Sequence, residues 1–188
     1  MEAPGRGPKS DSRGLNGARG FYGSPPSSWG LRPVQRSFVY AWAGLSYVYT
    51  TQANMRIHVL AAALAGAACI VTGLGRIEVL MVVLAIAGVL LAEVVNTVAE
   101  SMTDLLEPKR SPIAKVIKDV AAAGVLVSAV FSVLIAVLVF YPTLADIDVR
   151  LRAFLDTRLI PFAFYLVLVV LPALAGLALP LGPGTGHK

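Results

Sequence analysis

Charged residues are scarce in this sequence. Only 14% of its 188 residues are Asp, Glu, Lys or Arg, and 56% are apolar, whereas soluble domains average roughly 25% charged and roughly 45–50% apolar residues. Four apolar stretches are each close to the ~20 residues that ~30 Å of hydrocarbon requires. The composition excludes an ordinary soluble domain and predicts an all-α integral membrane protein.

Metal-binding and phosphate-binding motifs are scarce as well. The single cysteine, Cys69, excludes a disulfide framework and a multi-cysteine metal site, and a total of two histidines excludes a histidine-rich one. No G-x-x-x-x-G-K-[ST] loop occurs. Attraction to a membrane surface explains the basic N-terminal segment more simply than nucleic acid does, so we expect no nucleic-acid partner.

Two segments precede the first apolar stretch. Residues 1–33 are rich in Gly, Pro and Ser and nearly free of aliphatic side chains, which predicts a disordered basic tail without the apolar region of a signal peptide. From Val34 to about Thr50, large apolar residues recur on one helical face. This pattern predicts an amphipathic helix at the membrane surface; a soluble helix packed on a partner is the alternative.

The apolar stretches predict four spans. A polar loop is expected over residues 143–160, and a short tail over residues 182–188. The surface helix and the first three spans make up residues 34–142, and the fourth span, interrupted by Pro172, occupies residues 161–181. The expected spans run from about Ile57 to Leu74, from about Ile77 to beyond Val98, from about Asp119 to Tyr141, and from about Pro161 to Leu181.

The basic residues predict the orientation. Most Lys and Arg residues lie in the N-terminal arm and in the loop between the second and third spans. By the positive-inside rule, these two segments and the C-terminus are cytoplasmic. The end of the second span and the start of the third therefore meet on the cytoplasmic side of the membrane.

Four polar residues of the second span fall on one side of a helix. Their offsets of 0, 3, 7 and 11 residues define a narrow stripe, which we call the polar stripe: Glu93, Asn96, Glu100 and Asp104. The stripe is roughly 16 Å long, and a carboxylate at mid-bilayer costs on the order of 2.5–3.5 kcal/mol. A polar contact between helices is the structural alternative, but three acids favour a functional site.

The start of the third span supplies cations at the same depth. Lys115, Lys118 and Asp119 lie within its first turns. Lys118 alone could be an interfacial lysine that extends toward water. Together with the polar stripe, it predicts a pocket with carboxylates for Mg²⁺ and a lysine for phosphate, because Mg²⁺ prefers one or two carboxylates plus phosphate oxygens.

Two separated blocks of this sequence resemble the prokaryotic diacylglycerol kinase family, which includes the undecaprenol kinases of Gram-positive bacteria. They are Glu93–Asp104, with the pattern E-x-x-N-x-x-x-E-x-x-x-D, and Ala114–Ala122, with its Lys-Asp pair. Upstream, Tyr40–Leu45 and Asn54–His58 also resemble conserved blocks, so the resemblance extends from about Arg36 to Tyr141.

The resemblance implies a small bacterial enzyme of the cytoplasmic membrane. It has a surface helix and three transmembrane helices, forms a homotrimer with sites between neighbours, and transfers the γ-phosphate of ATP to a lipid hydroxyl with Mg²⁺ as cofactor. The family roles carried over by position are the following: Glu93 as general base, Asn96 beside the reacting groups, Glu100 on the metal, Lys118 and Asp119 on the nucleotide, Tyr40 near ATP, and Asp104 within the same motif.

This chain departs from the family pattern in two places. Gln52 stands where the family commonly has a glutamate as second metal ligand; an amide oxygen still coordinates Mg²⁺ but brings no charge. The fourth span is not part of the minimal family fold. These departures motivate an alternative, a catalytically impaired homologue that acts as a membrane scaffold or regulator.

The acceptor lipid stays open between undecaprenol and diacylglycerol. The block Arg56-Ile57-His58 looks more like the undecaprenol kinase branch. A third reading, a small transporter subunit with the polar stripe as an ion path, is weakened because the acids crowd one side of the membrane and do not span it.

Overall fold

The computed structural model describes residues 33–107 and 111–182. Nearly all of the predicted tail at residues 1–33, the basic loop positions 108–110 and residues 183–188 lie outside the described part. In that part the chain is helical and has no strands, which confirms the all-α prediction. The helical segments are α2 (Pro33–Thr51), α3 (Ala53–Thr72), α4 (Arg76–Leu106), α5 (Pro112–Phe140), the 3₁₀ turn η1 (Tyr141–Asp146), α6 (Ile147–Thr157), α7 (Leu159–Tyr165), the π turn η2 (Leu166–Val170) and α8 (Leu171–Ala178).

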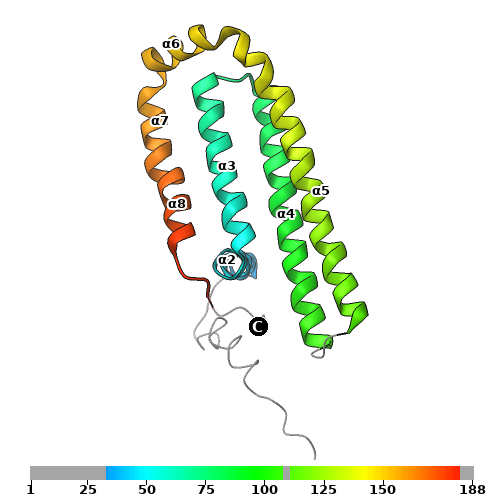
Figure 1. Ribbon diagram of the computed structural model, residues 1–188. Helices are drawn as coiled ribbons and strands as arrows, with labels where there is room; N and C mark the ends of the chain where they lie inside the picture. Colours follow the sequence, from blue (N-terminus) through cyan, green and yellow to red (C-terminus); the bar gives the residue numbers. More distant parts are fainter. Residues whose placement is uncertain (1–32, 108–110, 183–188) are drawn as a thin grey trace, which may run out of the picture.

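The long helices run alternately up and down (Figure 1). Helix α3 ascends, α4 descends, α5 ascends, and α7 to α8 descend on the other side of α3; α2 lies across the lower end and α6 across the upper end. We call these the α2 end and the α6 end. Among the described residues, four helical stretches are long and apolar enough to cross a membrane, as predicted: α3, α4, the run that begins with α5, and the run from Leu159 to Ala178.

Helix lengths explain why the polar end of α4 extends beyond the hydrocarbon layer. With 31 residues α4 is about 46 Å long, whereas the 20 residues of α3 span about 30 Å, which matches the hydrocarbon thickness. Only Gly73, Leu74 and Gly75 separate α3 from α4, so their ends are level at the α6 end. The extra length of α4, roughly 16 Å, therefore projects at the α2 end, beyond the hydrocarbon thickness that α3 spans.

Local sequence signals set the end of α3 and the start of α5. Gly73 adopts a left-handed conformation (φ 60°, ψ 51°) and its N–H bonds the Cys69 carbonyl at 2.9 Å, which ends α3. Ser111 caps α5, since its Oγ accepts a hydrogen bond from the Ala114 N–H at 3.2 Å, and Pro112 occupies the first turn. Helix α5 thus begins seven residues before the span expected from Asp119.

The stretch 143–160 differs from the polar loop that we expected. It forms part of η1 and all of α6, which lies across the α6 end. The Arg150 guanidinium donates to the carbonyl of Thr72 at 2.8 Å, and Phe154 is buried edge-to-face against Phe162, with 5.1 Å between ring centroids. Apolar residues spaced at the helical period among the charges explain why this stretch is an amphipathic helix.

The fourth span packs against α3. Ala63 of α3 and Val170 and Ala173 of the fourth span form a small buried core. The Tyr165 hydroxyl donates to the Ala63 carbonyl at 3.0 Å. The π turn η2 ends two residues before Pro172, whose ring and missing N–H disturb regular helical hydrogen bonding. The interruption expected at Pro172 is therefore a local widening, and the span continues.

Candidate functional site

The upper part of the polar stripe is buried inside the bundle near the α2 end. The Glu93 side chain is only 1% exposed and Asn96 is 4% exposed. Thr97, which is also buried, donates its hydroxyl to the Glu93 carbonyl at 2.9 Å, an ordinary bond within the helix. This part of α4 therefore places a carboxylate and an amide in the protein interior.

Neither carboxylate oxygen of Glu93 has a hydrogen-bond partner among the described residues, and the same holds for Asn96 Oδ1. Leaving a buried acceptor unpaired costs ~1–3 kcal/mol, and more for a charged group. Glu93 and Asn96 therefore offer open acceptors for a proton or for a ligand that donates hydrogen bonds.

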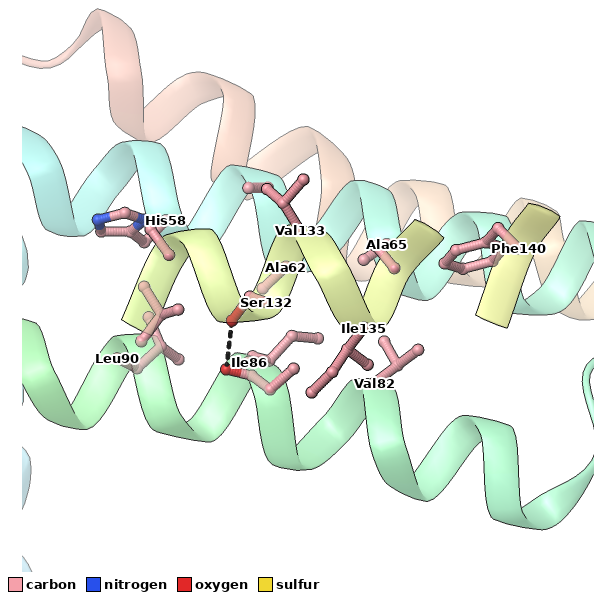
Figure 2. Close-up of a pocket in the computed structure, with 15 residues that line it drawn as sticks. His58, Ala62, Ala65, Val82, Ile86, Leu90, Ser132, Val133, Ile135 and Phe140 are labelled. Carbon is pink, nitrogen blue, oxygen red and sulfur yellow. Dashed lines mark hydrogen bonds between the residues drawn. The ribbon is translucent and has the colours of Figure 1, made fainter. Parts of the chain in front are cut away.

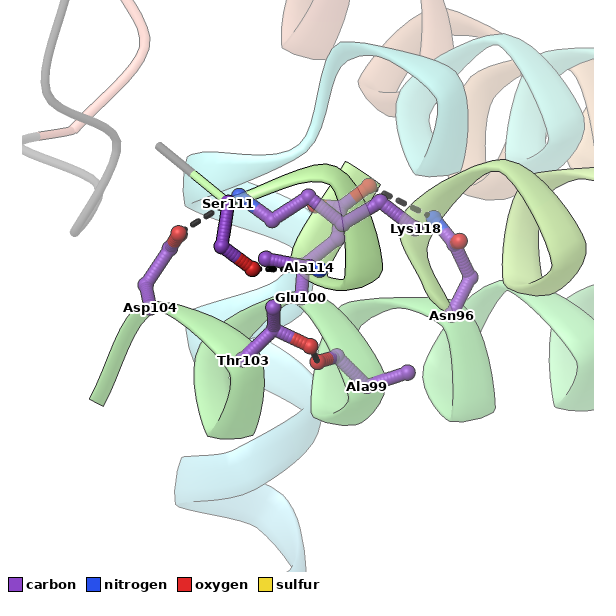
Figure 3. Close-up of polar contacts among 8 residues, drawn as sticks. All are labelled: Asn96, Ala99, Glu100, Thr103, Asp104, Ser111, Ala114 and Lys118. Atoms are coloured by element: carbon purple, nitrogen blue, oxygen red, sulfur yellow. Dashed lines mark hydrogen bonds and ion pairs between the residues drawn. The ribbon is translucent and has the colours of Figure 1, made fainter. Parts of the chain in front are cut away.

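Toward the end of α4, a hydrogen bond and an ion pair hold the side chains of the stripe in place (Figure 3). The Asn96 amide nitrogen donates to Glu100 Oε1 at 3.0 Å, which fixes the amide with Oδ1 turned away. One helical turn further, Asp104 Oδ1 accepts from Lys118 Nζ of α5 at 2.5 Å. Lys118 and Asp104 are about one third exposed, so the pair contributes little to stability. It does hold an ammonium group beside the stripe.

The other predicted site residues lie on α2, at the α2–α3 junction and on α5. Tyr40 is 53% exposed on α2, and Gln52 is half-buried at the junction of α2 and α3. Lys115 and Asp119 are exposed on α5. Within residues 33–107 and 111–182, no hydrogen bond or ion pair joins Tyr40, Gln52 or Asp119 to the stripe. The structure brings Asn96 to Glu100 and Asp104 to Lys118.

Comparison with known proteins identifies the scaffold that carries this site. Residues 39–140, from α2 to the end of α5, match the family described as prokaryotic diacylglycerol kinase. The chain belongs to the prokaryotic diacylglycerol kinase family. It is therefore a lipid kinase, and kinase chemistry implies ATP as phosphoryl donor.

Two relatives of this kinase support the assignment. The chain is 34% identical to a diacylglycerol kinase from Synechocystis sp. over 125 residues, which cover 65% of this chain and 71% of that one. It is 37% identical to the undecaprenol kinase of Bacillus subtilis over 109 residues, which cover 58% of this chain and 89% of that one. No solved structure matches this chain.

The donor atoms of the kinase suit Mg²⁺ chemically. Magnesium takes oxygen ligands, commonly one or two carboxylates completed by phosphate oxygens and water. Glu100 and the open Oδ1 of Asn96 are oxygen donors of this kind on one helix. In the described parts of the chain, no three acidic, His or Cys side chains gather into a metal cluster. The residues therefore fit an ion held jointly with phosphate better than an all-protein cage.

An apolar cavity of about 250 Å³ lies between α3, α4 and α5 of the kinase (Figure 2). It extends from His58 and Leu90 toward Phe140. Val89 and Leu90, which line it, precede Glu93 by about one helical turn on α4, whereas Glu93 itself is not among the lining residues. Sequence reasoning missed this cavity; its signal is the cluster of small residues that line it, Ala61, Ala62, Ala65, Ala129 and Ala136.

Proposed function

We propose that this lipid kinase transfers the γ-phosphate of ATP to the hydroxyl of undecaprenol or diacylglycerol, with Glu93 as general base. The observation that carries the proposal is the buried Glu93 carboxylate, which has no partner in the described part of the chain. It follows Val89 and Leu90, two residues that line the apolar cavity, by one helical turn on α4. A lipid chain in that cavity would bring its polar end to Glu93. A base within hydrogen-bond reach of the acceptor hydroxyl is what this reaction requires.

In the proposed reaction, Glu93 accepts the proton of the lipid hydroxyl while that oxygen forms its bond to the γ-phosphorus. The bond from the γ-phosphorus to the bridging oxygen breaks, and ADP leaves with the bonding electrons. Asn96 orients the reacting groups, and Lys118, held by Asp104, offsets negative charge on the phosphates. Tyr40 and Asp119 contact the nucleotide, as the family resemblance implies.

Glu100 and Gln52 would hold Mg²⁺ in this scheme, with Glu100 as the charged ligand. When bound, Mg²⁺ supplies neutralisation of the phosphate charge. Gln52 contributes only an amide oxygen, and α2 and α3 meet at its position. This assignment rests on the resemblance and on the oxygen donors of the stripe.

We expect the enzyme to work as a homotrimer in the bacterial cytoplasmic membrane, with its sites between neighbours and facing the cytoplasm. Tyr40, Gln52 and Asp119 make no bond to the polar stripe within the described single chain, which supports sites completed by a neighbouring copy. The α2 end also carries the basic residues Arg36, Arg56, Lys115 and Lys118 of α2, α3 and α5, which supports the cytoplasmic side.

The test is direct phosphoryl transfer. Purified full-length protein in detergent is incubated with γ-labelled ATP, Mg²⁺ and either undecaprenol or diacylglycerol, and labelled lipid is quantified. We expect label in one lipid and its loss with Glu93→Gln, while Glu78→Gln, an exposed acid at the opposite end of α4, serves as control. Folded protein that labels neither lipid would instead support the alternative, an impaired homologue acting as scaffold or regulator, which Gln52 and the fourth span motivate.

A further inference from the structure

Arg56 is a buried cation that the proposed reaction does not use. It is 4% exposed and lies in the first turn of α3. A positive charge at a helix N-terminus opposes that helix's own dipole. Its burial therefore requires compensation from elsewhere in the protein.

The compensation comes from the ends of two other helices. All five N–H donors of a guanidinium are used by main-chain carbonyls. Nε donates to Tyr49 at 2.9 Å and Nη2 to Thr50 at 2.8 Å, both in the last turn of α2. The other three bonds reach the C-terminal end of the fourth span: Nη1 donates to Gly176 at 3.1 Å and to Leu179 at 2.5 Å, and Nη2 to Pro180 at 3.3 Å.

Close packing reinforces this junction. The Gly182 N–H donates to the Thr50 carbonyl at 2.9 Å. The phenol of Tyr49 occupies the space that a Cβ on Gly176 would need, and the Arg56 guanidinium lies 5.8 Å from the Tyr49 ring centroid. The end of α8 is thus fixed to the α2–α3 corner by side-chain, main-chain and ring contacts.

The family match places the two sides of this junction in different parts of the chain. Residues 39–140 match the family, and they contain Arg56, Tyr49 and Thr50. Gly176, Leu179 and Pro180 lie beyond that range. The fourth span therefore supplies three of the five acceptors for a cation that belongs to the kinase core.

We propose that Arg56 is a positioning residue: it clamps the end of the fourth span onto the α2–α3 corner and thereby fixes α2 and Gln52 against the kinase core. The catalytic part of this proposal rests on the proposed function. Helix α2 contacts both α3 and α4, the helix that carries the polar stripe, so a shift of α2 would be transmitted to α4. Lysine cannot replace Arg56, because an ammonium has three donors and no planar fork.

A designed disulfide tests the docking independently of activity. A Cβ built on Gly182 lies 3.9 Å from the Thr50 Cβ, within the usual disulfide range of ~3.5–4.5 Å. Full-length Thr50→Cys/Gly182→Cys in a Cys69→Ala background should form an intramolecular disulfide in membranes, read as loss of both maleimide-reactive thiols. Adding Arg56→Gln should slow its formation several-fold. Thiols that stay fully reactive under oxidation would overturn the docking.

Restoring the activity of the Arg56→Gln variant with the disulfide then tests whether Arg56 positions α2 or acts on the substrates directly. We expect Arg56→Gln to raise the Mg·ATP concentration for half-maximal rate by about tenfold, with the lipid KM within twofold, and Arg56→Lys to behave similarly. The oxidised disulfide should restore the wild-type value, and reduction should abolish the rescue. Arg76→Gln, an exposed arginine at the α6 end, is the matched control.

One outcome would contradict the positioning role of Arg56, and a different one would contradict the proposed kinase function. If the disulfide forms in the Arg56→Gln variant but the Mg·ATP concentration for half-maximal rate stays raised, Arg56 acts on the substrates directly and positioning is wrong. If wild-type protein phosphorylates neither lipid while Arg56→Gln slows disulfide formation, the clamp stands and the proposed function fails. Should Arg56→Gln fail to fold, the same comparison is made with Arg56→Lys.

Discussion

Lys118 Nζ lies 2.5 Å from Asp104 Oδ1 and joins the last turns of α4 to the start of α5. Both side chains remain about one third exposed, so an incoming anion can reach the ammonium. The carboxylate holds Lys118 in place beside Glu100 and Asn96, one and two helical turns further up the polar stripe (Figure 3). The pair is suited to receive a phosphate, and its two members should differ in importance.

This difference can be measured. Lys118→Met removes the cation and should lower kcat/KM for ATP on the order of 100-fold, since phosphoryl transfer depends on charge stabilisation. Asp104→Asn leaves the cation and should cost only about threefold through looser positioning. Both variants should keep their melting temperatures, because an exposed ion pair contributes only ~0–1 kcal/mol. Equal losses in the two variants would indicate a structural pair without a role in phosphate binding.

Substitution of Glu93 should lower the reaction rate strongly without lowering the stability of the protein. Glu93→Gln is nearly isosteric and should lower kcat by on the order of 10²–10⁴, the contribution of a general base. It also removes a buried carboxylate that has no partner in the described residues, so the thermal midpoint should stay equal or rise. A variant with lower stability and unchanged kcat would show that Glu93 is structural.

Gln52 should govern metal dependence. Gln52→Glu adds a charged oxygen ligand and should lower the Mg²⁺ concentration for half-maximal rate several-fold, because carboxylates bind hard cations more strongly than amides do. Gln35→Glu places the same charge earlier on α2 and controls for a general field effect. An unchanged Mg²⁺ titration in Gln52→Glu would show that residue 52 does not touch the metal.

The apolar cavity should affect only the lipid. Ala65 lines it from α3, so Ala65→Phe fills part of the volume and should raise the lipid KM about tenfold while the ATP KM stays within twofold. Leu64→Phe, on the exposed face of the same helix, is the matched control and should change neither constant. A parallel rise in the ATP KM would mean that the substitution distorts the whole site.

Local patterns predicted much of the fold and part of the site. Spacing alone put Glu93 and Asn96 on one face of a helix, and the structure buries both. Ser111 and Pro112 start α5 through local chemistry, a side-chain cap and a proline in the first turn. Residues 143–160 looked like a loop because their charges are dense, yet the period of their apolar residues, including buried Phe154, is helical.

Local patterns could not predict contacts between residues that are far apart in the sequence. From the sequence, Arg56 looked like one more cytoplasmic cation. Its acceptor at Gly176 is 120 positions away. That acceptor is a main-chain carbonyl, which every residue has, so the residue type gives no signal. Asp119 shares the first turns of α5 with Lys118, but the structure leaves it exposed while Lys118 turns to Asp104. Helical spacing fixes the face of a residue, whereas the packing of neighbouring helices decides which faces meet.

The packing of the fourth span against α3 should depend on Gly66, because its missing side chain leaves room for a tyrosine side chain. A Cβ on Gly66 would collide with the Tyr165 phenol, whereas Cβ atoms on Gly88 and Gly124 would meet nothing within 4 Å. Gly66→Ala should therefore lower the unfolding free energy by ~1–3 kcal/mol, as overpacking does. Gly88→Ala and Gly124→Ala should be neutral or stabilising by up to ~1 kcal/mol through helix propensity.

The tyrosine offers an internal check on this prediction. Tyr165→Phe removes the phenol oxygen that comes closest to the added methyl group, at the cost of the hydrogen bond to Ala63. Thermal unfolding of both single variants and of Gly66→Ala/Tyr165→Phe gives a double-mutant cycle. Because the second substitution relieves the collision, the double variant should be more stable than the sum of the single losses predicts. Strict additivity would show that Gly66 and Tyr165 do not pack against each other, and that the fourth span is held to α3 by other contacts.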